Sequence, residues 1–162
     1  MRLNTINNLL RGIILFSVLL LGCKNSMKEV IIETHSNGSA KTIKYIEEND
    51  NESLLKKEIQ YYENGKKRYE GHFNNNKKDG EWIFWFENGN IWSEGYFKAG
   101  IRSGKSKVFH ENGSLYYDGA YSEGKKQGIW HFYNPEGIEV NWVKYEKGSI
   151  IEQKKKSDDS KE

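Results

Sequence analysis

The sequence predicts an all-β fold, an elongated single-sheet antiparallel meander of stacked β-hairpin repeats, and two regularities support this prediction. Turn residues recur every 24 residues in several columns, of which one is Gly71, Gly95, Gly119 and another is Gly80, Gly104, Gly128. Aromatic residues keep the same step, as in the columns Phe73, Phe97, Tyr121, Tyr145 and Tyr61, Trp85, Phe109, Tyr133. An unbroken period of this length indicates a repeat architecture in which each unit stacks on its neighbours.

Each repeat contains two turn signals. Asn-Gly occurs at positions 64–65, 88–89 and 112–113, between runs with the composition of β-strands. This dipeptide is typical of a two-residue type I′ hairpin turn, which needs positive φ at both central residues. The second turn falls at Asn76, Gly100 and Gly124. Since Asn is the residue that most readily replaces Gly at positive φ, we expect a left-handed conformation throughout this column.

The register of the sheet follows from the condition that equivalent residues share a face. A three-residue loop at the second turn would exchange the faces of successive repeats, so we expect either a four-residue loop or a bulge near Gly80, Gly104 and Gly128. The four-residue loop would pair Tyr69 with Trp82, Ser93 with Ser106, and Tyr117 with Trp130. A two-residue Asn-Gly loop would pair Trp85 with Trp92, Phe109 with Tyr116, and Tyr61 with Arg68.

Most large apolar residues fall on one side of the predicted sheet, which we call the aromatic face. Its expected members are Tyr69, Phe73, Trp82, Phe84, Phe86, Ile91, Phe97, Val108, Leu115, Tyr117, Tyr121, Trp130 and Phe132. Cross-strand pairs of aromatic and β-branched residues each contribute roughly 0.2–1 kcal/mol to such a sheet. The opposite side, the mixed face, carries charged residues around a few aromatic ones.

The motifs of the repeat resemble those of a known family. The segments Tyr-Tyr-Glu-Asn-Gly-Lys (61–66), Tyr-Glu-Gly-x-Phe (69–73) and Lys-Lys-Asp-Gly-Glu-Trp (77–82) resemble a MORN repeat. The Glu-Asn-Gly spacing is similar to that of the bacterial variant in YwqK-family antitoxin components of toxin–antitoxin systems. The resemblance implies the β-hairpin fold and, for the partner, a toxin. Ser106 departs from the pattern, because tryptophan occupies this position in the flanking repeats.

Residues 1–22 are predicted to be a lipoprotein signal peptide. Two arginines precede an apolar run of nine residues, which ends at Leu21 and is too short to span a bilayer as a helix. The sequence Leu-Leu-Gly-Cys resembles a bacterial lipoprotein cleavage site, so we expect lipidation of Cys23. The alternative is an ordinary signal peptide followed by an unrelated cysteine. We expect a membrane-anchored lipoprotein of the cell envelope. If the cell has an outer membrane, we expect it there, because residue 24 is Lys and not the Asp of the best-known inner-membrane retention signal.

The rest of the chain divides by composition. We expect a short tether over 23–34, a degenerate first repeat over 35–60, the MORN-type repeat domain over 61–152 and a disordered charged tail over 153–162. Between residues 61 and 145 lie 20 of the 22 aromatic residues, so the core belongs to the repeat domain. At about 4.8 Å per strand, about eight to ten strands would make a sheet of roughly 40 Å.

Charge and cysteine content exclude several function classes. Residues 1–22 hold two of the 25 basic residues and none of the 23 acidic ones, so the remaining chain carries 23 of each. This balance, with the predicted export, indicates no nucleic-acid partner. Cys23 is the only cysteine, which leaves no disulfide framework, redox pair or cysteine-based zinc site.

No residue pattern indicates catalysis, a metal or a cofactor. Glu70, Glu94 and Asp118 recur every 24 residues, which places them about two strands, or 9–10 Å, apart. That distance is too large for one shared metal ion. No two of the four histidines are at the spacing of metal ligands, no serine lies in a nucleophile motif, and the repeat accounts for the glycines. We therefore expect a protein that is not an enzyme.

Two features indicate binding instead. Aromatic residues on the mixed face form a predicted seam with acidic neighbours, whose candidate partner-binding residues are Trp85, Trp92, Phe109, Tyr116, Glu94 and Asp118. The alternatives are that the N-terminal segment or the curvature of the sheet covers the seam, or that the register differs and the two faces are exchanged. The second feature is Ser106, predicted to face Ser93 and Gly119, which leaves either a weak point or a notch that receives a partner's side chain.

These observations leave two functions open. The first is a lipid-anchored, non-catalytic repeat module that binds a protein or an envelope component. The second is the antitoxin or immunity protein that the family resemblance implies, whose partner is a cognate toxin.

Overall fold

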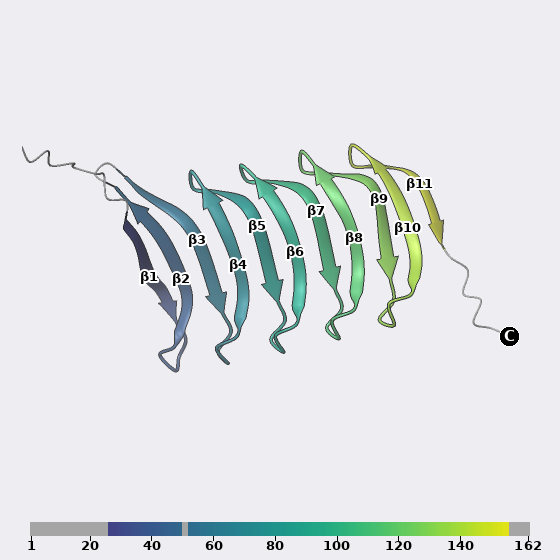
Figure 1. The fold of residues 1–162 in the computed structure, drawn as a ribbon. Helices are drawn as coiled ribbons and strands as arrows, with labels where there is room; N and C mark the ends of the chain where they lie inside the picture. Colours follow the sequence, from purple (N-terminus) through teal and green to yellow (C-terminus); the bar gives the residue numbers. More distant parts are fainter. Residues whose placement is uncertain (1–25, 50–51, 156–162) are drawn as a thin grey trace, which may run out of the picture.

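The computed structural model describes residues 26–49 and 52–155, which form one antiparallel sheet of eleven strands (Figure 1). The strands are β1 Ser26–Thr34, β2 Ala40–Glu48, β3 Ser53–Tyr61, β4 Lys67–Asn74, β5 Lys77–Trp85, β6 Ile91–Lys98, β7 Ile101–Phe109, β8 Leu115–Ser122, β9 Lys125–Tyr133, β10 Glu139–Glu146 and β11 Ser149–Lys155. Each strand pairs with its neighbours in sequence, so the order in the sheet is the order in the chain. The predicted all-β meander is confirmed, with one strand more than expected.

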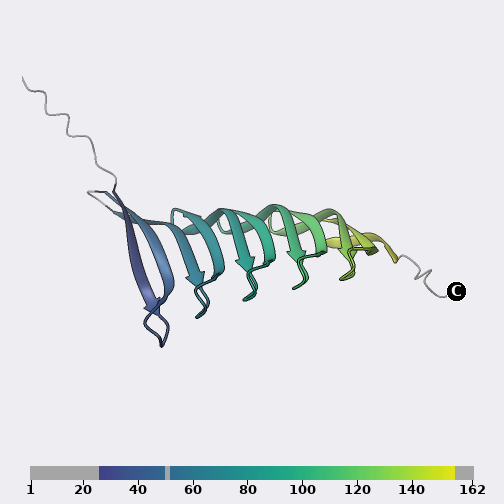
Figure 2. The ribbon, with the colours of Figure 1, turned by 60° about the horizontal axis from the view of Figure 1, so that its bottom comes forward.

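The sheet is a single layer. Figure 2 shows its strands bent into a curved, twisted strip, with the described part of the chain forming no second sheet and no helix over either face. Few side chains are therefore fully buried, and the buried apolar ones are Ile43, Ile59, Trp82, Trp130 and Val143. Stability has to come from contacts between neighbouring strands, as in other quasi-one-dimensional arrays.

The second turn of each repeat is a two-residue type I′ turn. Both central residues have positive φ at Asn75–Asn76 (48° and 57°), Ala99–Gly100 (51° and 89°) and Glu123–Gly124 (51° and 78°). The predicted left-handed column is confirmed. The structure adds that the residue before it, even Ala99 or Glu123, is left-handed as well, because type I′ geometry matches the twist of the flanking strands.

The Asn-Gly loops differ from the type I′ turns expected for them. The amide of Gly65 donates to the carbonyl of Tyr62 at 3.0 Å, and the amide of Tyr62 donates to the carbonyl of Lys66 at 2.8 Å. Gly65 has φ of 80°, whereas Asn64 is not among the residues with positive φ. This is a three-residue loop, a type I turn closed by a glycine bulge. The asparagine contributes through its side chain, because Asn64 Nδ2 donates to the carbonyl of Glu87 in the next loop at 3.1 Å.

A bulge at the second glycine column sets the register between repeats. Gly71 pairs with Trp82 but Phe73 pairs with Lys78, so the three residues 79–81 lie opposite the single residue His72 of β4. The bulge was one of the two expected solutions and is confirmed; the four-residue loop is wrong. The expected pairs are shifted by two residues, since Tyr69 lies opposite Phe84 rather than Trp82. A two-residue shift keeps each side chain on its predicted face.

A further bulge after each Asn-Gly loop moves one column to the other face. Phe84 pairs with Ser93 and Trp85 pairs with Ile91, which leaves Trp92 as the extra residue. The expected pair Trp85–Trp92 is therefore wrong, as are Phe109–Tyr116 and Tyr61–Arg68. Ile91 and Leu115, expected on the aromatic face, instead lie opposite Trp85 and Phe109 on the mixed face.

Both ends of the sheet extend further than expected. Residues 26–34, predicted to belong to the tether, form β1, which pairs along β2 with Ile31 opposite Ile43. Residues 153–155, predicted to belong to the disordered tail, complete β11 against β10. Backbone pairing with an existing strand edge stabilises polar segments whose composition alone predicts no strand. Cys23, the predicted signal peptide and residues 156–162 lie outside the described residues.

Candidate binding surface on the aromatic face

A row of tryptophan and glycine residues runs across the aromatic face. Trp82 lies between Gly71 and Gly95 on the neighbouring strands, and only 3% of it is exposed. A Cβ atom built on Gly71 would lie 2.6 Å from Cε3 of Trp82, and the same holds for Gly119 and Cγ of Trp130. The indole rings therefore lie directly over backbone, and these glycines leave the space that the rings fill.

Other aromatic rings surround each tryptophan in the same pattern. Tyr69 stacks on Trp82 with ring centroids 5.9 Å apart, and Phe73 and Phe97 approach the indole edge-on at 5.3 and 5.9 Å. Around Trp130 the corresponding rings are those of Tyr117, Tyr121 and Tyr145. Edge-to-face and offset pairs of this kind add about 0.5–1.5 kcal/mol each to the burial of the rings.

A column of cations, which is not among the site residues predicted from the sequence, lies over the rings. Lys78 Nζ is 3.8 Å from the ring centre of Trp82, and Lys126 Nζ is 4.4 Å from that of Trp130. Arg102 has the equivalent position in the middle repeat, with Cζ 5.7 Å from the ring centre of Phe97 and 5.2 Å from that of Tyr121. Burial, and then the charge of Arg102, lowers the pKa of Lys78. The spacing of 24 residues between the three cations was the available signal.

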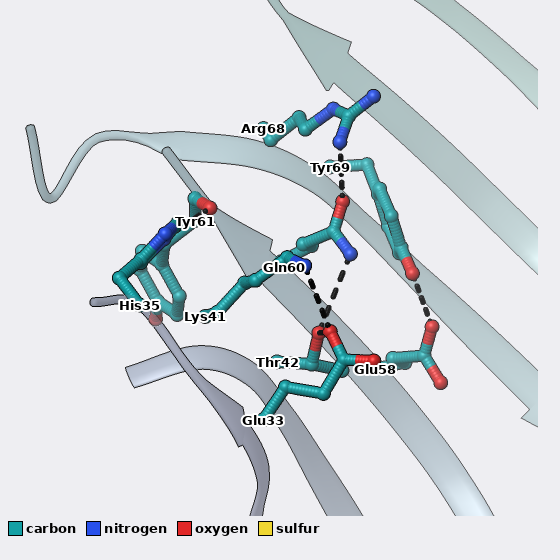
Figure 3. Close-up of polar contacts among 9 residues, drawn as sticks. All are labelled: Glu33, His35, Lys41, Thr42, Glu58, Gln60, Tyr61, Arg68 and Tyr69. Carbon is teal, nitrogen blue, oxygen red and sulfur yellow. Dashed lines mark hydrogen bonds and ion pairs between the residues drawn. The ribbon is translucent and has the colours of Figure 1, made fainter. Parts of the chain in front are cut away.

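The aromatic face becomes polar toward the N-terminal end of the sheet (Figure 3). Arg68 donates to Gln60 Oε1 at 3.1 Å, Gln60 donates to Thr42 Oγ1 at 3.3 Å, and Thr42 donates to Glu33 Oε2 at 3.3 Å. The chain of hydrogen bonds crosses β4, β3, β2 and β1. Glu58 lies 24 residues before Trp82, at the equivalent position of the repeat, and accepts a hydrogen bond from Tyr69. Burial, and then this hydrogen bond, raises the pKa of Tyr69. The aromatic surface thus begins at β4.

A pocket of about 230 Å³ opens in the aromatic face at the middle repeat. Its lining residues are Trp82, Phe84, Trp92, Ser93, Glu94, Gly95, Phe97, Arg102, Ser106, Val108 and Tyr117. Ser106 lies at its base, 5% exposed, and pairs with Gly95 on β6 and Gly119 on β8. The expected pairing with Gly119 is confirmed, whereas the expected pairing with Ser93 is wrong, because Ser93 lies opposite Val108.

The structure divides the predicted seam between the two faces. Trp92 packs against Phe84 and Phe86 with ring centres 6.0 and 6.2 Å away, and 48% of it is exposed. Tyr116 packs against Tyr117 and His110 and is 45% exposed. These two rings belong to the edge of the aromatic face, because the bulge turns them there. Their role in partner binding stays a prediction.

The remaining seam residues lie on the mixed face. Trp85 borders a hollow of about 160 Å³ together with Lys67, Glu70 and Ile83. Phe109 lies opposite Leu115, and Glu94 forms an ion pair with Lys107 at 3.4 Å. The role of these residues in partner binding is also still a prediction.

The acidic column behaves as the spacing predicted. Glu70 and Glu94 both lie opposite Ile83, and Glu94 and Asp118 both lie opposite Lys107, so its members are two strands apart. Burial raises the pKa of Glu70, but the hydrogen bond from Lys67 and the charges of Lys57 and Lys67 outweigh it, so that its pKa is below the ordinary value.

The residues that the structure describes contain no group of three or more His, Cys, Asp or Glu side chains placed to hold a metal ion. They also contain no helix of sufficient length and apolar character to cross a membrane.

The comparisons with known proteins agree with the period and the hairpins. No curated protein matches this chain significantly. The family model described as MORN repeat variant matches it at residues 54–75, 78–99 and 102–123, which are the hairpins β3–β4, β5–β6 and β7–β8. The expected MORN-type repeats are thereby confirmed at these three consecutive segments, whereas the similarity to YwqK-family antitoxin components stays a prediction.

Proposed function

We propose that this protein is a lipid-anchored, non-catalytic repeat module that binds a protein or another envelope component through its aromatic face. The supporting observation is the exposure of that face. Within residues 26–49 and 52–155, no second layer covers the aromatic face. This face carries the half-exposed rings of Trp92 and Tyr116 and a pocket of about 230 Å³. Large exposed apolar patches on soluble domains mark sites of interaction.

The anchor is proposed from the sequence around Cys23. Three Cα–Cα steps join Cys23 to Ser26, the first residue of β1, and they span at most about 11 Å. A diacylated Cys23 would therefore hold the N-terminal edge of the sheet close to the membrane. Partners within reach are then proteins or other components of the same envelope surface, in the outer membrane if the cell has one.

The two faces of β6 allow a matched test. Trp92 on the aromatic face and Tyr96 on the mixed face are equally exposed, at 48% and 46%, and lie on one strand. A photo-crosslinking amino acid at position 92 should form a discrete adduct in intact membranes. The same residue at position 96 should form little of it. Equal adducts from both positions, or an adduct from position 96 alone, would contradict binding through the aromatic face.

An antitoxin or immunity protein is the second candidate, favoured by the resemblance of the Glu-Asn-Gly repeats to antitoxin components. Its partner would be a toxin, held by the same face. Expression of the neighbouring gene without this protein should then stop growth, and expression together with it should restore growth. A neighbouring gene that is harmless in both cases would count against this candidate and leave the first intact.

A further inference from the structure

We propose that the pocket at Ser106 receives a tryptophan side chain of a partner protein, whose indole takes the place of the ring that the middle repeat lacks. The proposal deepens the function proposed above and rests on it, because it names the chemical group that the aromatic face binds. The protein itself supplies the template, since the flanking repeats show how a tryptophan is held at this position.

The middle repeat has space for an additional ring. In the flanking repeats a tyrosine and a tryptophan are in ring contact, Tyr69 with Trp82 at 5.9 Å and Tyr117 with Trp130 at 5.6 Å. The middle repeat has serine at both equivalent positions, and the pocket of about 230 Å³ lies there. Apolar cavities of about 150 Å³ already bind benzene. The pocket therefore has room for an indole.

The base of the pocket is formed by the backbone at Gly95. Gly71 and Gly119 are in contact with the indoles of Trp82 and Trp130, whereas the nearest atom to a Cβ on Gly95 would be Ser106 Oγ at 3.7 Å, an ordinary contact. Gly95 does not have positive φ either. Its lack of a side chain leaves a flat backbone surface of the kind on which Trp82 and Trp130 lie.

The other neighbours of a bound indole are already in place around the pocket. Phe97 corresponds to Phe73 and Tyr121, the rings that approach Trp82 and Trp130 edge-on. Arg102 corresponds to Lys78 and Lys126, the cations over those indoles. An indole bound in the pocket would thus lie on glycine backbone, meet an aromatic ring edge-on and have a cation over it, as Trp82 and Trp130 do. A cation favours an electron-rich ring, for which tryptophan is the best side chain, and disfavours a positively charged ligand.

Charge restricts the partner further. Lys78, Arg102 and Lys126 form a positive row along the aromatic face, and their ring partners carry no charge. Arginine pairs with carboxylates through two parallel hydrogen bonds. We therefore expect the inserted tryptophan to have Asp or Glu as a close neighbour in the partner's sequence, so that the carboxylate meets Arg102.

The test uses full-length, isotope-labelled protein in lipid nanodiscs, titrated with N-acetyl-L-tryptophanamide. Saturable chemical-shift changes should appear at the amides of Gly95 and Ser106. Ser106→Trp fills the site from within and should weaken this binding at least about tenfold. Ser122→Trp adds the same ring at an exposed position at the end of β8 and should leave the binding unchanged. Ser93→Tyr fills the pocket from the neighbouring strand and replaces Ser106→Trp if that variant does not fold.

The outcomes separate this inference from the proposed function. Absence of saturable shifts at Gly95 and Ser106, or binding that persists in both filled variants, would overturn the inference. If the adduct from position 92 nevertheless forms, the aromatic face binds a partner without an inserted ring. If the probe binds but the adduct shows no preference for position 92 over 96, the pocket is real and the proposed function fails.

Discussion

The contrast between Gly71 and Gly95 offers the most direct test of the packing on the aromatic face. Both glycines occupy the same position of the repeat and neither has positive φ, so alanine fits either backbone. The difference lies in what a methyl group would meet. At Gly71 it would lie 2.6 Å from Cε3 of Trp82, with other ring atoms closer still, and at Gly95 it would lie 3.7 Å from Ser106 Oγ.

The magnitudes follow from these contacts. Overpacking a well-packed site costs roughly 1–3 kcal/mol, because the indole of Trp82 has to leave its place between the neighbouring rings. Alanine within a strand is otherwise favoured over glycine by about 0.5–1 kcal/mol, since glycine loses more backbone freedom on folding. After this gain is subtracted from the overpacking cost, Gly71→Ala should lower Tm by up to about 10 °C, and Gly95→Ala should leave Tm unchanged or raise it slightly.

Thermal unfolding followed by circular dichroism and tryptophan fluorescence measures both variants. A third measurement combines Gly95→Ala with Ser106→Trp. In this background a tryptophan ring would lie over residue 95, so Gly95→Ala should become destabilising like Gly71→Ala. The reasoning would be refuted if Gly95→Ala were as costly as Gly71→Ala in the wild-type background, since the ring over the glycine would then not be the cause.

Three other predictions concern the turns, the mixed face and the anchor. Gly124 has φ of 78°, so Gly124→Val should lower the free energy of unfolding, measured in urea, by more than about 1 kcal/mol. Asn76→Gly should be neutral or slightly stabilising, and equal effects of the two substitutions would contradict the type I′ turns. Because the pKa of Glu70 is lowered in the folded state, its contribution to stability is present above about pH 4.5 and is lost as the pH falls below that value. The difference in unfolding free energy between wild type and Glu70→Gln should therefore shrink from pH 7 to pH 3. A difference that stays constant would argue against the ion pairs with Lys57 and Lys67. Cys23→Ser should abolish labelling by fatty-acid analogues and release the protein from membranes, and unchanged labelling would end the lipoprotein interpretation.

Local signals in the chain predict much of the fold and part of the candidate site. Columns such as Gly71, Gly95 and Gly119 keep a period of 24 residues, and this period specifies hairpin repeats without knowledge of any contact. Alternation along each strand assigns most side chains to a face, because successive residues point to opposite sides. The departure at Ser106 is also visible in the sequence, and with it the position of the pocket.

Only the tertiary structure decides the register and the membership of each face. The bulge at Trp92 inserts one residue into the pairing of β6 with β5, which moves Trp92 to the aromatic face and Ile91 to the mixed face. Nothing in the local composition marks such an insertion, because it depends on how two strands meet. Likewise Ser93 and Ser106 leave one common pocket although neither faces the other in the ladder. The sequence by itself determines that these residues repeat, whereas the bulges between strands determine what each of them touches.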